Sequence, residues 1–220
     1  MKNKILSTVY GLAVFFLIIT FAIGLPIYFR GFYYLQIGTL GIEKSSGFNY
    51  QTIKTAYDQV LDFLTLPFTT FQTGGLAYTE AGKQHFIDCK WLFTLNSVVL
   101  IVSFATFITL IVLNKKRVIT LCKPFKKDVS FISALAVLIL FATLSIIVAV
   151  DFNGAFVVFH KIFFYGKDNW IFDPKKDEII KILPAEFFLN CAVLIACAIA
   201  VTCLTVILIQ IFKRTKKERK

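Results

Sequence analysis

The stretch from residue 80 to residue 113 reads EAGKQHFIDCKWLFTLNSVVLIVSFATFITLIVL. Its second part, residues 91–113, contains no Asp, Glu, Lys, Arg or His and exceeds the ~20 residues that a helix needs to cross a bilayer. Its first part is polar and holds His85, one of only two histidines in the chain. The stretch therefore predicts a membrane helix with a histidine just outside the hydrocarbon.

Three further apolar runs of the same kind occupy residues 5–29, 129–150 and 187–212, and 57% of the 220 residues are hydrophobic. Only helices and closed barrels satisfy their own backbone in lipid, and these runs lack the alternation of barrel strands. We expect an all-α membrane protein with four transmembrane helices, forming a single integral membrane domain over residues 1–220. The first run is too long for a signal peptide and is expected to be retained.

The placement of the charges predicts the orientation in the membrane. Fourteen of the 24 Lys and Arg residues, but only two of the 13 acidic residues, lie at the two termini and in the loop 114–128. Positive residues collect on the cytoplasmic side, so both termini and this loop are predicted to be cytoplasmic. The segments 30–90 and 151–186 then lie outside the cell. Topology explains the net charge of +11 without a nucleic-acid partner.

The two outer segments are expected to form a small extracytoplasmic cap of mixed short strands and helix. Aromatic residues and glycines between Gly31 and Gly41 favour short strands. Apolar residues at helical spacing predict an amphipathic helix from Asn49 to Thr65. Residues 78–90 are predicted to be helical and to continue into the second transmembrane helix. Asp173-Pro174 is typical of a helix start, for a helix that runs through Lys181.

Cysteine and acidic residues near His85 leave several kinds of chemistry open. On a helix, Asp88 and Cys89 lie three and four residues after His85, where either side chain could orient the imidazole. His85, Asp88, Cys89 and His160 could in principle ligate zinc, but their spacing matches no common zinc motif. No G-x-S-x-G sequence is present for a serine hydrolase. The five cysteines are too scattered for a disulfide framework.

His160 lies just after the third apolar run, so both histidines are expected at the same face of the membrane. A histidine among apolar residues is often only a hydrogen-bonded core residue. Its near-neutral pKa nevertheless makes it the usual group for proton transfer. The apolar runs lack ionisable residues, which argues against an ion-coupled transporter. We therefore interpret His85 and His160 as a proton-transfer pair, with His85 as the base because Glu80 and Asp88 could stabilise its protonated form.

Two sequence signatures resemble a known family. The first is Glu80-x4-His85-x2-Asp88-x-Lys90. The second begins Phe156-x2-Phe159-His160 and continues through Trp170-x-Phe172-Asp173-Pro174 to Phe188. With the four-helix topology, they resemble the bacterial lipoprotein intramolecular transacylases, called Lit, over essentially the whole chain.

The resemblance implies transfer of the sn-2 acyl chain of a diacylglyceryl lipoprotein to the α-amine of its own N-terminal cysteine. It implies His85 and His160 as catalytic residues, with Glu80, Asp88, Lys90 and Asp173 as supporting candidates. The substrate lipoprotein and membrane lipids are the expected partners, without a cofactor, a metal, nucleic acid or an obligate protein partner. The expected location is the cell membrane, with the active site on the extracellular side.

Two other functions fit the residues. One is a non-catalytic envelope or immunity membrane protein whose outer cap binds a partner. The other is an outer-leaflet lipid hydrolase that uses His85 with Cys89.

Overall fold

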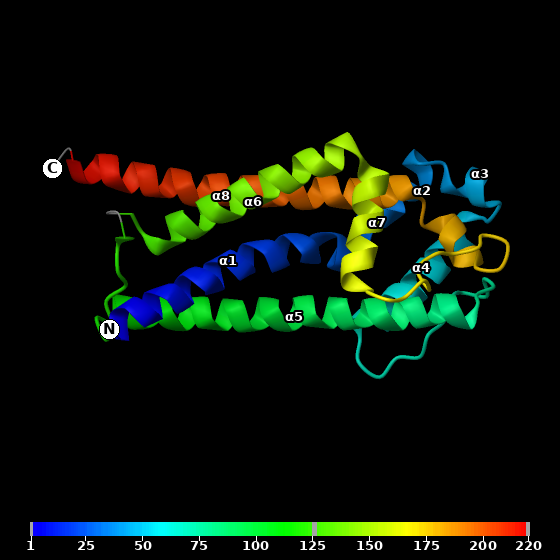
Figure 1. Cartoon of the computed structure of the whole chain (residues 1–220), viewed down its shortest axis with the longest axis horizontal. Helices are drawn as coiled ribbons and strands as arrows, with labels where there is room; N and C mark the ends of the chain where they lie inside the picture. The colour runs from blue at the N-terminus through cyan, green and yellow to red at the C-terminus, as the bar shows by residue number, and fades with distance from the viewer. Residues whose placement is uncertain (1, 125–126, 219–220) are drawn as a thin grey trace. The chain divides into compact units, whose positions relative to one another are not determined.

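The computed structural model describes residues 2–124 and 127–218, and within those ranges every regular element is helical (Figure 1). The elements are α1 (Lys2–Tyr28), α2 (Gly31–Thr39), α3 (Ile42–Ser46), α4 (Tyr50–Thr65), α5 (Glu80–Lys115), α6 (Val129–Val150), α7 (Phe152–Phe163), the 3-10 helix η2 (Glu178–Ile182) and α8 (Ala185–Glu218).

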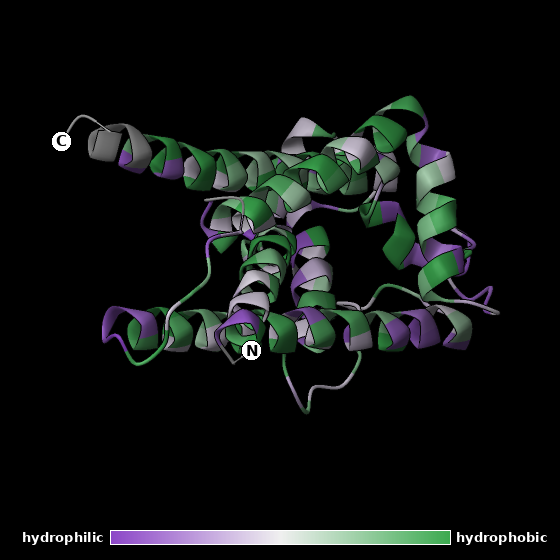
Figure 2. Cartoon of the chain, turned by 60° about the vertical axis from the view of Figure 1, so that its left-hand side comes forward, coloured by the Kyte–Doolittle hydropathy of each residue, from purple (hydrophilic) through white to green (hydrophobic). Residues whose placement is uncertain are grey.

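Four of these helices, α1, α5, α6 and α8, are long and apolar enough to cross a membrane. Figure 2 shows that most of their length is hydrophobic, with hydrophilic residues towards their ends. The prediction of an all-α protein with four membrane helices is confirmed. It succeeds because uninterrupted apolar length is a strong signal of a helix in lipid.

The chain divides into two compact units. The first comprises Met1–Gly24, Asn96–Ile146 and Leu194–Lys220. Its core includes Val14, Ala134 and Ile199, and polar side chains join its helices. Ser133 Oγ donates to the Gly11 carbonyl over 2.8 Å, and Asn96 Nδ2 donates to the Thr20 carbonyl over 3.3 Å. These bonds satisfy polar groups between apolar helices, where water is scarce.

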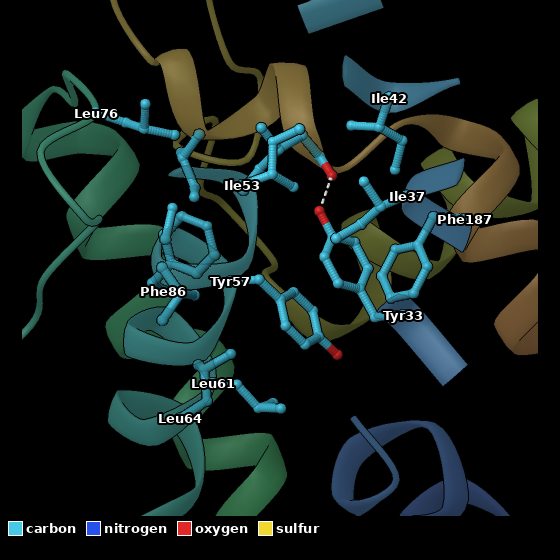
Figure 3. Packing of buried hydrophobic residues seen from close by; sticks show 14 of the residues in the cluster. Tyr33, Ile37, Ile42, Ile53, Tyr57, Leu61, Leu64, Leu76, Phe86 and Phe187 are labelled. Carbon is cyan, nitrogen blue, oxygen red and sulfur yellow. Dashed lines mark hydrogen bonds between the residues drawn. The ribbon is translucent and has the colours of Figure 1, made fainter. Parts of the chain in front are cut away.

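The second unit comprises Leu25–Leu95 and Ile147–Val193. Figure 3 shows its core, which is centred on Tyr33. The Tyr33 hydroxyl donates to the Ile182 carbonyl over 2.7 Å, and its ring stacks on Tyr57 with centroids 3.7 Å apart. Asn190 Nδ2 donates to Gln36 Oε1 over 2.7 Å, which ties α8 to α2. Both histidines belong to this unit.

The short strands expected between Gly31 and Gly41 were wrong, because this stretch forms α2 and leads into α3. Tyr33, Gln36 and Ile37 are all buried, at spacings of three and four, which fits one helical face. Gly41 has a φ of 61° and separates the two helices. Aromatic content favoured strands, but a strand would point the neighbours Gln36 and Ile37 to opposite faces.

The amphipathic helix expected from Asn49 to Thr65 is confirmed as α4. The Asn49 side chain accepts the Thr52 N–H over 2.9 Å and caps the helix. Ile53, Val60 and Leu64 point into the core. On the opposite side, Asp58 and Asp62 both pair with Arg30.

The helix expected from Asp173 to Lys181 was also wrong. Asp173 Oδ1 accepts the Lys175 N–H over 3.0 Å and closes a turn, and only Glu178–Ile182 is helical, as η2. The cause is Asp177, whose buried carboxylate accepts bonds from Thr79 N at 2.7 Å and Thr79 Oγ1 at 2.8 Å. This tertiary contact holds the chain away from a continuous helix. The η2 face then buries Ile179 and Ile182.

Candidate active site

His85 lies near the start of α5, where a polar helix start meets the 171–177 turn. Thr79 Oγ1 accepts the Gly82 N–H over 3.0 Å and caps the helix. The absence of a side chain at Gly82 lets Asp177 and Phe172 approach, since a Cβ there would lie 2.5 Å from Asp177 Oδ1. This close contact places Phe172 beside His85, with ring centroids 5.5 Å apart.

His160 lies in the last turn of α7, an amphipathic helix that begins at Asp151. The Asp151 carboxylate accepts the Gly154 N–H over 2.8 Å and caps this helix. His160 is buried, whereas Phe159, Ile162 and Phe163 on the same helix are exposed. Figure 1 shows α7 (yellow) running toward the N-terminal part of α5. The sequence had not indicated a helix here.

The two imidazoles meet inside an aromatic enclosure. Their ring centroids lie 5.7 Å apart, and His85 and His160 are only 6% and 7% exposed. Phe164 packs against both rings, at 4.7 Å from His85 and 5.5 Å from His160. Trp170 lies 4.8 Å from His160. The structure thus brings together two residues that are 75 positions apart in the sequence.

The hydrogen bond made by His160 fixes which of its nitrogens carries the proton. Nδ1 lies 2.7 Å from the Phe156 carbonyl oxygen, which can only accept, so Nδ1 is the donor. Burial lowers the pKa of His160 and favours the neutral ring. In that ring Nε2 carries a lone pair, and no hydrogen-bond partner for it is found among the described residues. Nε2 is therefore the nitrogen of His160 that can accept a proton.

His85 has a different environment. Its Nε2 lies 3.4 Å from the Cys89 thiol, and its buried Nδ1 has no partner among the described residues. A buried polar atom without a partner is costly, and in a native site it indicates a position that a ligand can satisfy. Of the two neighbours considered for His85, the structure gives the contact to Cys89.

Asp88 instead joins a polar cluster with the segment that follows α7. Its carboxylate accepts bonds from Lys167 Nζ at 2.7 Å, Asn169 Nδ2 at 3.0 Å and Gln84 Nε2 at 3.3 Å. Lys167 and Asn169 had not been singled out in the sequence. The one feature of the sequence that points to this segment is the high content of aromatic residues between 163 and 172.

The remaining sequence candidates lie away from the two rings. Glu80 is 83% exposed and pairs with Lys83 over 3.1 Å. Lys90 Nζ donates to the Leu66 carbonyl over 3.0 Å and lies over the Phe63 ring. Asp173 closes the turn already described. Burial and the neighbouring His160 lower the pKa of His85 to about 4 and outweigh the raising effect of Asp88, so the two acidic residues do not keep His85 protonated.

A pocket of about 310 Å³ adjoins the histidines. It shares Phe164 with the enclosure around them, and Asp88 and Lys167 form its polar part. Apolar side chains from α5 and α7 form the rest of its lining, namely Ile87, Trp91, Leu92 and Phe163. Trp91 and Phe163 are also exposed. The pocket thus suits a molecule with apolar chains and a polar group.

Among the described residues, no group of three or more His, Cys, Asp or Glu side chains is arranged to hold a metal ion. The site offers two imidazoles, a thiol and a carboxylate–amine cluster. Two neighbouring imidazoles can accept and return protons.

Comparisons with known proteins agree on one family. The model of the family described as "Lipoprotein intramolecular transacylase Lit" matches residues 8–188. An in meso structure of the membrane integral lipoprotein intramolecular transacylase Lit from Bacillus cereus is 26% identical, with a TM-score of 0.87 over 100% of this chain and 99% of that one.

The same Bacillus cereus protein with an H85A mutation has a TM-score of 0.80 at 23% identity, over 100% of this chain and 96% of that one. Its form with an H85R mutation has a TM-score of 0.77 at 23% identity, over 98% and 95%. These two show likeness of fold. Among the curated proteins, none matches this chain.

Proposed function

This chain belongs to the lipoprotein intramolecular transacylase Lit family, and on that premise we propose which acyl group it moves and how. The sn-2 acyl chain of the diacylglyceryl group is transferred to the α-amine of the N-terminal cysteine of the same lipoprotein. The product is an N-acyl lipoprotein whose glycerol carries a single acyl chain. The protein is then an acyltransferase with a lipid-modified polypeptide as substrate.

The observation that carries this proposal is the buried pair of imidazoles, with ring centroids 5.7 Å apart, each with one ring nitrogen that makes no hydrogen bond to the described residues. Ester aminolysis requires one proton to leave the amine and one to reach the glycerol oxygen. Two adjacent imidazoles serve both transfers.

The reaction begins when the neutral α-amine attacks the ester carbonyl. An α-amine has a pKa of about 8, so an imidazole can take its proton. His160 Nε2 accepts that proton, since the Phe156 carbonyl holds the other nitrogen as the donor. We assign to His85 Nδ1, which is buried without a partner among the described residues, the hydrogen bond to the reacting oxygen atoms. The proton that His160 took from the amine passes to the departing glycerol oxygen, directly or by way of the His85 ring, so both imidazoles end neutral. The amide bond forms, the ester C–O bond breaks, and no acyl-enzyme or water takes part.

Attack closes a ring of about eight atoms, so the protein must hold a flexible substrate in one orientation. The pocket lined by Leu92, Phe163 and Phe164 is suited to an acyl chain. Lys167 lies at its polar part. Exclusion of water by the aromatic enclosure also disfavours hydrolysis of the ester.

The charge distribution supports an extracytoplasmic site. The predicted cytoplasmic loop 114–128 and the two termini carry most of the basic residues, which leaves both histidines on the other face. In the proposed reaction, the diacylglyceryl group of the substrate lies in the outer leaflet of the membrane, on the same side as the histidines.

The test is mass spectrometry of lipoprotein N-termini from a bacterial host with and without this protein. We expect N-acylated peptides with one remaining glycerol-linked chain only when the protein is present. The variant Lys83→Gln, which alters a partly exposed residue on α5, should preserve them, and His160→Ala should not. An unchanged acylation pattern would exclude the transacylase function and favour a non-catalytic membrane protein.

The contact of 3.4 Å between Cys89 and His85 favours a second candidate, a lipid hydrolase with a thiol nucleophile. In that case a lipid substrate would release free fatty acid, and Cys89→Ser would abolish the release. Under transacylation, Cys89→Ser should still give N-acylated product without free fatty acid. The two products are separated by mass, so a single assay distinguishes the candidates.

A further inference from the structure

Asn169 carries the second buried polar atom that lacks a partner among the described residues. Its Oδ1 is buried without a hydrogen bond, as is Nδ1 of His85. The amide orientation is set by Asp88, because a carboxylate can only accept and must face the amide nitrogen. Oδ1 therefore faces away from Asp88 as a free acceptor.

Asn169 belongs to the chain segment that encloses the histidines. This segment contacts His85 through Phe164 and Phe172, and contacts His160 through Trp170, the next residue in the chain. Asp88, which holds the Asn169 amide, lies one helical turn after His85 on α5 and lines the pocket. These neighbours are the reason to assign the free acceptor of Asn169 to the same site as the histidines.

A buried acceptor requires a donor, and the reacting group of the proposed substrate that donates is its α-amine. We propose that Asn169 Oδ1 accepts a hydrogen bond from the substrate's α-amino group, holds it beside the imidazoles and makes the site selective for a free N-terminus. This assignment rests on the proposed function. Asn169 is then a substrate-binding residue, and Asp88 is a positioning residue that acts through it.

The test measures binding of two non-reactive ligands to the full chain in detergent micelles. One is a lipopeptide whose glyceryl group carries two ether-linked alkyl chains, which cannot be transferred. The other is the same lipopeptide without its α-amine. We expect the wild type to bind the amine ligand roughly ten-fold more tightly, as one hydrogen bond to a polar or charged donor provides.

Three variants test whether Asn169 is responsible for this ratio of the two Kd values. Asn169→Ala should lower the ratio of the two Kd values to near one. The exchange Asp88→Asn with Asn169→Asp restores the hydrogen bond and keeps an acceptor oxygen, so its ratio should equal or exceed that of the wild type. Gln84→Met removes another partner of Asp88, an exposed residue outside the pocket lining, but leaves the Asn169 acceptor, so its ratio should stay near ten.

Equal binding of both ligands by the wild type, or an unchanged ratio in Asn169→Ala, would overturn the assignment. A loss of the ratio in Gln84→Met would also overturn it, because the whole cluster rather than Asn169 would then select the amine. If Asn169→Ala does not fold, the exchange variant decides, and a ratio below the wild-type value contradicts the proposal. Turnover of an ester-linked lipopeptide by the wild type tests the transacylase function separately.

Discussion

The two histidines differ in what the fold fixes. His160 has one nitrogen committed to the Phe156 carbonyl, and this bond sets its tautomer. The hydrogen-bond contact of the His85 ring among the described residues is to a thiol, which can donate or accept, so either of its nitrogens can carry the proton. This difference supports His160 as the base and His85 as the group that changes its role during the reaction.

Replacing either histidine should have a large effect on the rate. General acid–base catalysis contributes about 10²–10⁴-fold, so His160→Ala and His85→Ala should each lower the initial rate by at least about 10²-fold. The double variant should be little worse than either single variant, since the two act as one unit. The rates are measured with purified protein and a diacylglyceryl lipopeptide. Additive losses would indicate two independent roles.

The burial of His160 also predicts how stability depends on pH. Its pKa is lower in the folded protein than in the unfolded chain, so the unfolded chain binds this proton more readily at acidic pH. The free energy of unfolding should therefore decrease as the pH falls below about 6.5, by at most about 1.4 kcal/mol per pH unit from this residue.

The measurement is the melting temperature in detergent between pH 7.5 and 5, in the wild type and in His160→Gln. Groups that do not interact with His160 cancel in the comparison, whereas His85 does not, because the charge of His160 lowers its pKa. The wild type should lose more stability than the variant on acidification. Parallel curves would show that His160 is protonated equally in the folded and unfolded states.

At the scale of the elements, the site depends on the contact between the start of α5 and the turn before η2. Asp177 accepts two hydrogen bonds from Thr79 and leaves no room for a side chain at Gly82. Phe172 is held against His85 by the same contact.

Gly82→Ala should therefore destabilise the protein although alanine favours helices. The added Cβ would lie 2.5 Å from Asp177 Oδ1 and 3.0 Å from Phe172, and overpacking of this kind costs about 1–3 kcal/mol. The matched control is Gly38→Ala in α2, where a Cβ would meet nothing within 4 Å. That variant should be neutral or more stable by up to about 1 kcal/mol. Melting temperatures in detergent compare the two.

The sequence predicts some elements better than others for physical reasons. In α4, a capping residue and a regular apolar face agree, so local pattern and burial give the same answer. In the stretch from Asp173, a good local helix start is overridden by Asp177, whose partner Thr79 is distant in the sequence. Such a contact cannot be inferred from local propensity.

At the scale of the whole molecule, the length of the apolar runs is sufficient to predict four membrane helices. The histidines stand out because the chain contains only two of them. The polar partners around them were beyond prediction. Lys167 and Asn169 both donate hydrogen bonds to Asp88, some 80 residues earlier in the chain, and no periodicity links them.

The orientation in the membrane remains a prediction that labelling can test. In a cysteine-free background, Ser45→Cys in the outer segment should react with a membrane-impermeant maleimide in intact cells. Val118→Cys, in the predicted cytoplasmic loop, should react only after the cells are opened. Both positions are exposed, so accessibility within the protein does not limit labelling. The reverse pattern would place the histidines on the cytoplasmic face.

Helix α7 has a consequence for kinetics. His160 on this helix is buried, whereas the apolar side chains of Val158, Ile162 and Phe163 are exposed. Phe163 also lines the pocket that shares Phe164 with the histidine enclosure. Under the proposed function, a two-tailed substrate enters sideways from the surrounding lipid and never crosses water. The encounter rate is then governed by the number of substrate molecules per lipid molecule. Adding inert lipid or detergent at a constant bulk substrate concentration should slow the reaction by surface dilution.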